Sequence, residues 1–355
     1  MFLRVAVTKA GTAAKVLAVF ILCTLIIIFS SECSEEAALG IKFCLGVLVP
    51  SLFPFMAISS FVVNCGLASV IGKPFRHITK QLFGLSPCFT TAIFLSLLGG
   101  YPVGARTISS IYQRGIASKA ECEKAAMFAV CAGPGFVINF VGITLYNNQK
   151  IGLIMMCSQC LSVLIIGVIM GLVHRDKTDI SYNELSHKPM SFSSALVQAT
   201  LDSSKGMLTI CAFVLLFSSL TGILKAVVPG SNTKDFLLIL LEVCSAVNEL
   251  AKRAPVELIA FAVGFGGLCV HFQIYSSLKE LNINKLLFFC IRIIQGVITA
   301  LITHIGLIIF EEEAEVFSTI TVQNTDIFEG SLLSAAVLLG IAICFLYSIK
   351  NYKQN

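Results

Sequence analysis

The stretch LGGYPVGARTISSI, residues 98–111, lies in the middle of an apolar run that extends from Pro87 to Gln113. A glycine pair followed by a proline interrupts a helix, and a helix broken inside a membrane exposes backbone N–H and C=O groups. Hydrocarbon tolerates such groups only where protein, water or a solute pairs with them. The stretch therefore predicts a membrane segment that is broken at its centre.

The composition agrees with a membrane location for the rest of the chain. Hydrophobic residues make up 56% of the 355 residues and charged residues only 13%, about half the charged share of a typical soluble domain. Apolar stretches of about 20 residues recur from end to end, whereas the alternating ten-residue pattern of membrane barrels is absent. We therefore predict an all-α polytopic membrane protein with about eight to ten membrane segments.

Hydrophobicity and charge divide the chain into five expected parts. The outer parts are a membrane anchor with an outer loop and, at the other end, an acidic loop with a final membrane helix. Two membrane repeats lie between them, separated by a polar connecting loop. The expected boundaries, in chain order, are 1–36, 37–173, 174–205, 206–310 and 311–355.

The basic loops indicate how the first repeat is threaded. The loops 72–81 and 114–124 both carry excess lysine and arginine, which favours the cytoplasmic side for both. A single crossing by 87–113 would place one of them outside, so we expect a re-entrant hairpin. In the second repeat Lys252 and Arg253 fit only one of two threadings, and the charges leave its topology open.

A second stretch, FGGLCVHFQIYSSL at residues 265–278, aligns with 98–111 without a gap at an offset of 167 residues. The two glycines, one valine and two serines coincide, which is five identities in fourteen where composition predicts about one. Paired glycines also let helices pack closely. Two matched breaks, together with GPG at 133–135, favour a solute pathway, because interrupted helices at matching positions of two halves are typical of transporter binding sites.

The candidate site residues are the breaks themselves and the polar side chains near them. Glu242, inside an apolar run, requires a partner or a proton. Tyr101 and Asn139 offer a hydroxyl and an amide to a solute. The full set is Gly99, Gly100, Tyr101, Pro102, Gly104, Arg106, Gly133, Pro134, Gly135, Asn139, Glu242, Gly266, Gly267, His271 and Gln273.

Two of these side chains admit opposed interpretations. Arg106 suits a carboxylate or phosphate of a solute, or else it extends to the cytoplasmic interface. His271, close to Gln273, could carry a coupling proton, or else it packs with a hydrogen bond.

Four motifs carry a resemblance to a known family: FPF at 53–55, GGYPVGAR at 99–106, GPGF at 133–136 and FGGLCVHFQ at 265–273. Over roughly 37–310 the chain resembles the YlbJ-type sporulation integral membrane proteins, which belong to the nucleoside-recognition or Gate domain families. Their relatives include concentrative nucleoside transporters and the membrane part of ferrous-iron transporters. The resemblance implies inverted repeats with re-entrant hairpins and an origin in an endospore-forming bacterium.

Signatures of other classes are missing from the sequence. Neither HExxH nor GxSxG occurs, and the 14 cysteines are scattered through apolar runs without a metal-site spacing. The net charge of +5 is spread over short loops and termini and forms no basic patch of the kind that binds nucleic acid. We therefore expect no enzyme activity, no cofactor, no metal site and no nucleic-acid partner.

Two functions remain as expectations. The first is a secondary transporter or permease of the bacterial plasma membrane for a nucleoside-like or anionic solute, with H+ or Na+ as the candidate coupling ion and a homo-oligomer as a candidate assembly. The second is a membrane-assembly protein needed for spore formation that does not transport.

Overall fold

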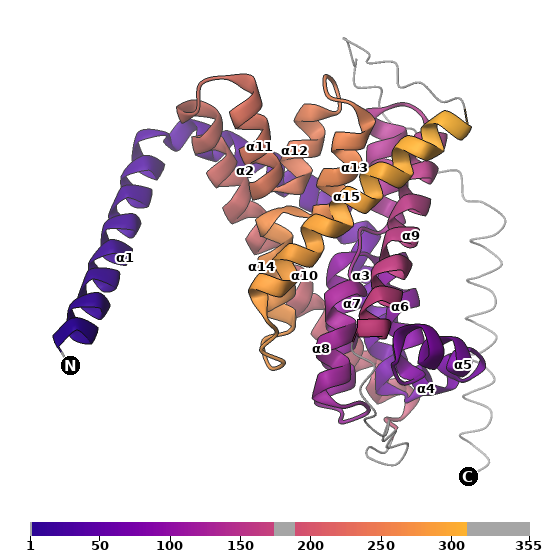
Figure 1. Ribbon diagram of the computed structural model, residues 1–355. Coiled ribbons are helices and arrows are strands. Elements are labelled where there is room, and N and C mark those ends of the chain that lie inside the picture. Colours follow the sequence, from indigo (N-terminus) through magenta and orange to yellow (C-terminus); the bar gives the residue numbers. More distant parts are fainter. Residues whose placement is uncertain (1, 174–188, 311–355) are drawn as a thin grey trace. The chain divides into compact units, whose positions relative to one another are not determined.

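The computed structural model describes residues 2–173 and 189–310, and within these ranges the chain is helical and contains no strand (Figure 1). The predicted all-α class is confirmed. The C-terminal unit that begins at Phe317, with the membrane helix predicted there, lies outside the described residues. The elements are α1 (Phe2–Ile28), α2 (Ser30–Phe43), η1 (Cys44–Leu48), α3 (Val49–Asn64), α4 (Leu67–Gly72), η2 (Lys73–Phe75), α5 (Arg76–Ile78), η3 (Thr79–Phe83), α6 (Cys88–Gly99), α7 (Tyr101–Gln113), α8 (Lys119–Phe128), η4 (Gly135–Leu145), α9 (Gln149–Val173), α10 (Phe192–Val227), α11 (Ser231–Leu241), α12 (Val243–Leu250), α13 (Val256–Phe265), α14 (Gly267–Ser277) and α15 (Lys285–Ile309).

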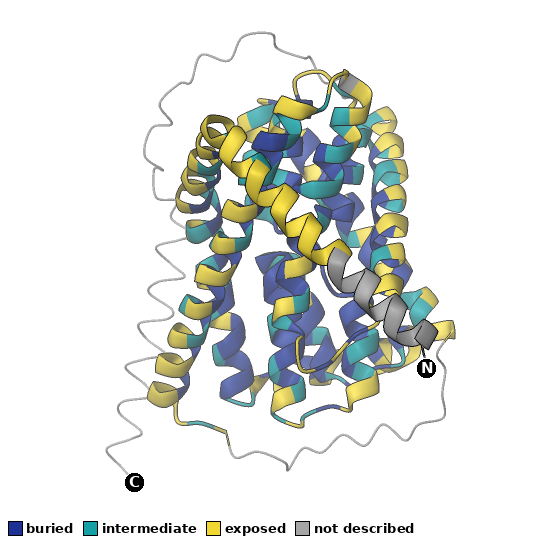
Figure 2. Ribbon diagram, turned by 90° about the vertical axis from the view of Figure 1, so that its left-hand side faces the viewer, coloured by how far each residue is buried: buried dark blue, intermediate teal, exposed yellow. Residues whose placement is uncertain are grey.

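Several of these helices are membrane spans by length and composition. Five apolar stretches in the described part of the chain are long enough to cross a bilayer: 30–64, 149–173, 192–227, 256–277 and 285–309. The pair 67–83 and 88–99, bent by 88°, would be a sixth. Many large apolar residues of the spans are exposed, among them Leu164 and Leu208. Exposed residues lie along the outer helices (Figure 2), and an apolar surface of this kind is unfavourable in water and favourable in lipid. The protein is membrane-embedded, and the count of eight to ten segments stays a prediction.

Helices α2, η1 and α3 form one long helical stretch that packs antiparallel to α10. At one end Lys225 forms an ion pair with Glu36 at 2.8 Å, and at the other the Asn64 amide approaches the Ala195 carbonyl at 3.4 Å. Helix α10 has 36 residues and is therefore about 54 Å long. A helix of this length exceeds the thickness of a bilayer, so its two ends mark the two faces of the protein.

The first hairpin consists of α6 and α7, which meet at Gly100. This glycine has φ of 87°, a conformation that side chains disfavour, and it reverses the chain. The Glu121 carboxylate accepts a hydrogen bond from the Ser86 backbone at 2.8 Å and one from the Ser118 hydroxyl at 3.1 Å. Because Ser86 precedes α6 and Ser118 follows α7, both ends of the pair lie side by side, as in the predicted re-entrant hairpin.

The next span is broken between α8 and η4. Residues 129–133 leave the helix and are buried. A Cβ added to Gly142 would approach Gly152, and one added to Gly167 would approach the Phe128 ring, so α8 and η4 both run alongside α9 in the opposite direction. They form one crossing with an interruption at its middle.

A second hairpin consists of α11 and α12, which meet at Glu242. The Arg253 guanidinium, beyond α12, donates to the Asp235 carboxylate, near the start of α11, at 2.5 and 2.6 Å. This exposed pair raises the pKa of Arg253 through its hydrogen bond to Asp235. With only eleven and eight residues, both helices are too short to cross a bilayer.

A second broken span, α13 and α14, follows this hairpin. Near its start Glu257 contacts His304 at 2.8 Å, and near its end the Tyr275 hydroxyl donates to the Lys285 carbonyl at 3.2 Å. The two helices therefore run one after the other along α15, interrupted at Gly266. The two windows that align in sequence thus fold differently, since the first forms a hairpin and the second crosses.

The two hairpins open at opposite ends of α10. Beyond the first, Arg114 donates to Asn64 at 2.6 Å, close to the start of α10, whereas Glu249 of the second pairs with Lys225 near its end at 3.0 Å. In Figure 1 these ends are the lower and the upper one. Lys252, next to Arg253, therefore lies at the end opposite to the basic loops 72–81 and 114–124. Of the two threadings that the charges left open, the structure agrees with the one that these two basic residues do not fit.

Two boundaries differ from the sequence prediction. Residues 30–36, expected in an outer loop, form the first turns of α2. The connecting loop expected over 174–205 ends earlier, because α10 begins at Phe192, with Ser191 as its cap. Serines, a threonine and two charged residues in 192–205 suggest a loop, yet Ala195 and Ala199 lie four residues apart and are fully buried.

Candidate functional site

The hairpin tips and the broken spans meet at one small cavity. Its volume is about 40 Å³, and its lining combines both tips (Gly100 and Glu242), the first break (Gly133) and α14 (Gln273) with apolar side chains of α3 and α10. A volume of this size holds roughly three water molecules. Residues that are up to 225 positions apart in the chain, Leu48 and Gln273, are thus brought to one place.

Each hairpin tip rests on a glycine of the broken span that follows it. A Cβ added to Gly133 would lie 3.0 Å from the Gly100 nitrogen, and one added to Gly267 would lie 3.2 Å from the Val243 nitrogen and from the Ile239 oxygen. Backbone packs directly on backbone at both places, which only glycine permits.

The same order of elements therefore occurs twice. A hairpin is followed by a broken span whose glycine supports the hairpin tip, and then by a long helix, α9 or α15. By this order the counterpart of Gly267 is Gly133, and the counterpart of Gly100 is Glu242. The sequence alignment at an offset of 167 instead pairs the tip at Gly100 with the break at Gly267.

Glu242 provides the only carboxylate that lines the cavity in the described part of the chain. It is 1% exposed, and its two oxygens accept hydrogen bonds from the backbone nitrogens of Cys244 at 2.9 Å and Ser245 at 2.6 Å. These bonds cap α12, whose positive end stabilises a negative charge. The hydrogen-bond partner that we expected for a buried Glu242 is thus the backbone of α12 itself.

Other predicted residues either line the cavity or pack around it. Tyr101 and Pro102 line it with Gly100, and the Tyr101 hydroxyl donates to the Val263 carbonyl. Five predicted glycines pack nearby without lining the cavity: Gly99, Gly104, Gly135, Gly266 and Gly267. The predicted Pro134, between Gly133 and Gly135, does not line it either.

Three predicted residues are not brought to the cavity. Arg106 donates to the Asp202 carbonyl at 2.6 Å and so joins α7 to α10. Asn139 is exposed on η4. His271 is fully buried, with Nδ1 2.6 Å from the Gly267 carbonyl and its ring among aromatic rings, which agrees with its packing interpretation. The structure therefore gives neither Arg106 nor His271 a direct route to a bound solute.

Sequence reasoning missed a fully buried arginine, Arg292, about two turns into α15. Its guanidinium contacts the carbonyls of both broken spans and lies 5.4 Å from the Tyr101 ring. The available signal was an arginine inside the apolar run 285–310, because ionisable residues within membrane spans usually have a function.

Comparison with known proteins gives one informative match. No family model and no solved structure matches the chain. The sporulation integral membrane protein YlbJ of Bacillus subtilis (strain 168) is 23% identical over 323 residues, which cover 79% of each chain. This similarity supports a YlbJ-type assignment. The match covers 79% of the chain and so extends well beyond the short motifs that first suggested the resemblance.

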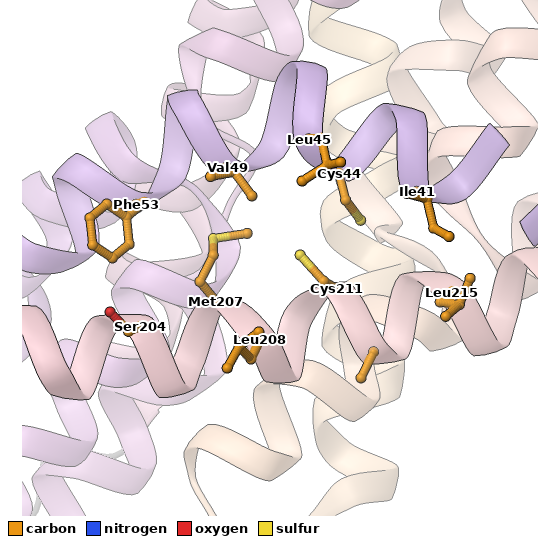
Figure 3. A pocket seen from close by; sticks show the side chains of 11 residues that line it. Ile41, Cys44, Leu45, Val49, Phe53, Ser204, Met207, Leu208, Cys211 and Leu215 are labelled. Carbon is orange, nitrogen blue, oxygen red and sulfur yellow. The ribbon is translucent and has the colours of Figure 1, made fainter. Parts of the chain in front are cut away.

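A larger groove lies on the outside of the helical bundle, between α2–α3 and α10 (Figure 3). Its volume is about 560 Å³, and apart from Ser204 its lining is apolar or sulfur-containing. Cys44 and Cys211 point toward each other across it. A groove of this chemistry within membrane spans suits lipid chains, so the smaller cavity is the candidate site for a polar solute.

Proposed function

We propose that the protein is a secondary transporter or permease that binds a small solute between the two hairpin tips, in the plasma membrane of a sporulating bacterium. One observation carries this proposal. Two hairpins that enter from opposite ends meet, with the first span break and α14 of the second broken span, at a cavity that contains a fully buried carboxylate. Broken helices at mid-membrane expose backbone groups that are useful around a solute and costly elsewhere.

We further propose that the two sets of elements are inverted structural repeats. The order of hairpin, broken span and long helix recurs, and the hairpins open at opposite ends of α10. Opposed hairpins supply one gate toward each face, because each tip closes the cavity from its own side. Parting of one tip at a time gives alternating access.

The cavity favours a neutral, hydroxyl-bearing solute of the nucleoside-like class over an anionic one. A carboxylate accepts hydrogen bonds from hydroxyl and amino groups, and it repels anions. No basic side chain lines the cavity among the residues that the structure describes, and Arg106 lies elsewhere. Apolar neighbours such as Phe136 and Val270 suit the faces of a base. Because the closed cavity holds only a few waters, such a solute requires a tip to move.

The small volume also favours the second candidate, a non-transporting assembly protein. A cavity of about 40 Å³ with mostly apolar walls is compatible with a fold that has lost its solute. The relative is named as a sporulation integral membrane protein.

Metabolite levels in sporulating cells separate the two candidates. We expect deletion of the gene to change the level of at least one nucleoside-like metabolite, and we expect the Glu242→Gln protein to reproduce that change at normal protein level. Untargeted mass spectrometry of the cells and their medium provides the measurement. Unchanged metabolites, in a deletion strain that still sporulates poorly, would favour the assembly protein.

A further inference from the structure

The buried guanidinium of Arg292 lies where two broken helices end. Its Nη1 donates to the Val130 carbonyl at 2.5 Å, just beyond α8, and its Nη2 donates to the Gly264 carbonyl, in the last turn of α13. Its Nε donates to the Phe265 carbonyl at 3.3 Å, and Nη1 also donates to Gln295 Oε1 at 2.5 Å. Four of its five N–H groups are therefore used, three of them on backbone carbonyls released by the breaks.

The charge of Arg292 is balanced by helix ends. No carboxylate forms an ion pair with Arg292 among the residues that the structure describes. The C-terminus of a helix carries about half a negative charge, so the ends of α8 and α13 together offer roughly one. A fully buried guanidinium can persist there because these two helix ends neutralise it.

Carbonyls of half-helix C-termini are the groups that hold coupling cations in secondary transporters. We propose that Arg292 is a built-in cation that occupies this carbonyl cluster permanently, so that the protein needs no Na+ to join its two broken spans. Arg292 is a positioning residue, because it fixes both breaks and, through the Tyr101 ring, the first hairpin tip. Only the consequence that solute movement is uncoupled from Na+ rests on the proposed function.

Thermal unfolding of the purified, lipid-reconstituted chain tests this proposal without a solute. We expect the wild-type Tm to be equal in sodium, potassium and choline chloride. Arg292→Ala should lower the Tm by about 5 °C or more. Millimolar guanidinium, far below denaturing concentrations, should recover at least part of this loss, because the free ion fills the vacated carbonyl cluster. Arg253→Ala, which removes an exposed guanidinium, is the matched control and should gain no response.

Two results would overturn the proposal. One is a Tm of the wild-type protein that sodium raises and potassium does not. The other is an Arg292→Ala protein that responds to guanidinium no more than the Arg253→Ala control, as a merely structural arginine predicts. If Arg292→Ala yields no folded protein, Arg292→Lys and Arg292→Gln decide. We expect the lysine variant to be more stable, and the reverse order contradicts a need for positive charge.

Discussion

Replacement of Glu242 by glutamine is expected to abolish solute handling while the protein remains in the membrane. The amide keeps the size of the side chain and one acceptor oxygen, but it loses the charge that a solute hydroxyl would contact. A hydrogen bond to a charged group contributes about 1.5–3 kcal/mol, or roughly 10- to 150-fold in affinity. The cap of α12 should weaken by only about 0.5–2 kcal/mol. Sporulation efficiency and immunoblots of membranes measure the two effects.

Glu249→Gln is the matched control for this change, because Glu249 lies on the same helix, α12, but pairs with Lys225 away from the cavity. We expect its function to stay within about twofold of wild type, since partly exposed ion pairs contribute less than 1 kcal/mol. Equal loss in both variants would show that α12 responds to any lost carboxylate, and that Glu242 has no special role.

Replacement of Gly267 by leucine is expected to have an equally large effect, through the backbone. Gly267 has φ of 71°, which costs other residues about 1–2 kcal/mol. Its added Cβ would also lie 3.2 Å from atoms of the second hairpin tip. Because these are backbone atoms, they cannot rotate away as a flexible side chain could. The tip cannot close over the cavity, so we expect loss of function with protein still inserted. Complementation of sporulation and the amount of protein in membranes measure this.

Gly46→Leu is the control, because a Cβ at Gly46 meets no atom within 4 Å. It should leave function and amount unchanged. Loss of the Gly267→Leu protein from membranes, with Gly46→Leu retained, would assign Gly267 to packing alone. Full activity of Gly267→Leu would contradict both a gating and a packing role.

The sequence was sufficient for the fold class and for the first hairpin, and the reasons are physical. Basic residues on both sides of 87–113 require both of its ends on one face, and Gly100 marks the reversal. The second hairpin has no such mark. Its turn is Glu242 alone, with neither glycine nor proline, and its extended conformation is one that any residue adopts.

The internal repeat shows where sequence similarity is a poor guide. Both windows contain paired glycines, yet Gly100 reverses the chain, whereas Gly266 and Gly267 interrupt a helix that continues. The same glycine pair thus occurs at a chain reversal in one window and at a helix interruption in the other. The role of Arg292 could not be predicted in the same way, because three of its four hydrogen-bond acceptors are backbone carbonyls distant in sequence, which no local pattern reveals.

The most direct measurement of the central claim is the accessibility of Cys244, a native cysteine that lines the cavity beside Glu242. In a variant that keeps only this cysteine, a small membrane-impermeant thiol reagent is applied to right-side-out and to inverted vesicles. The account predicts labelling from both faces, because each hairpin tip opens the cavity toward its own side. Labelling from one face only, or from neither, would contradict alternating access at this cavity.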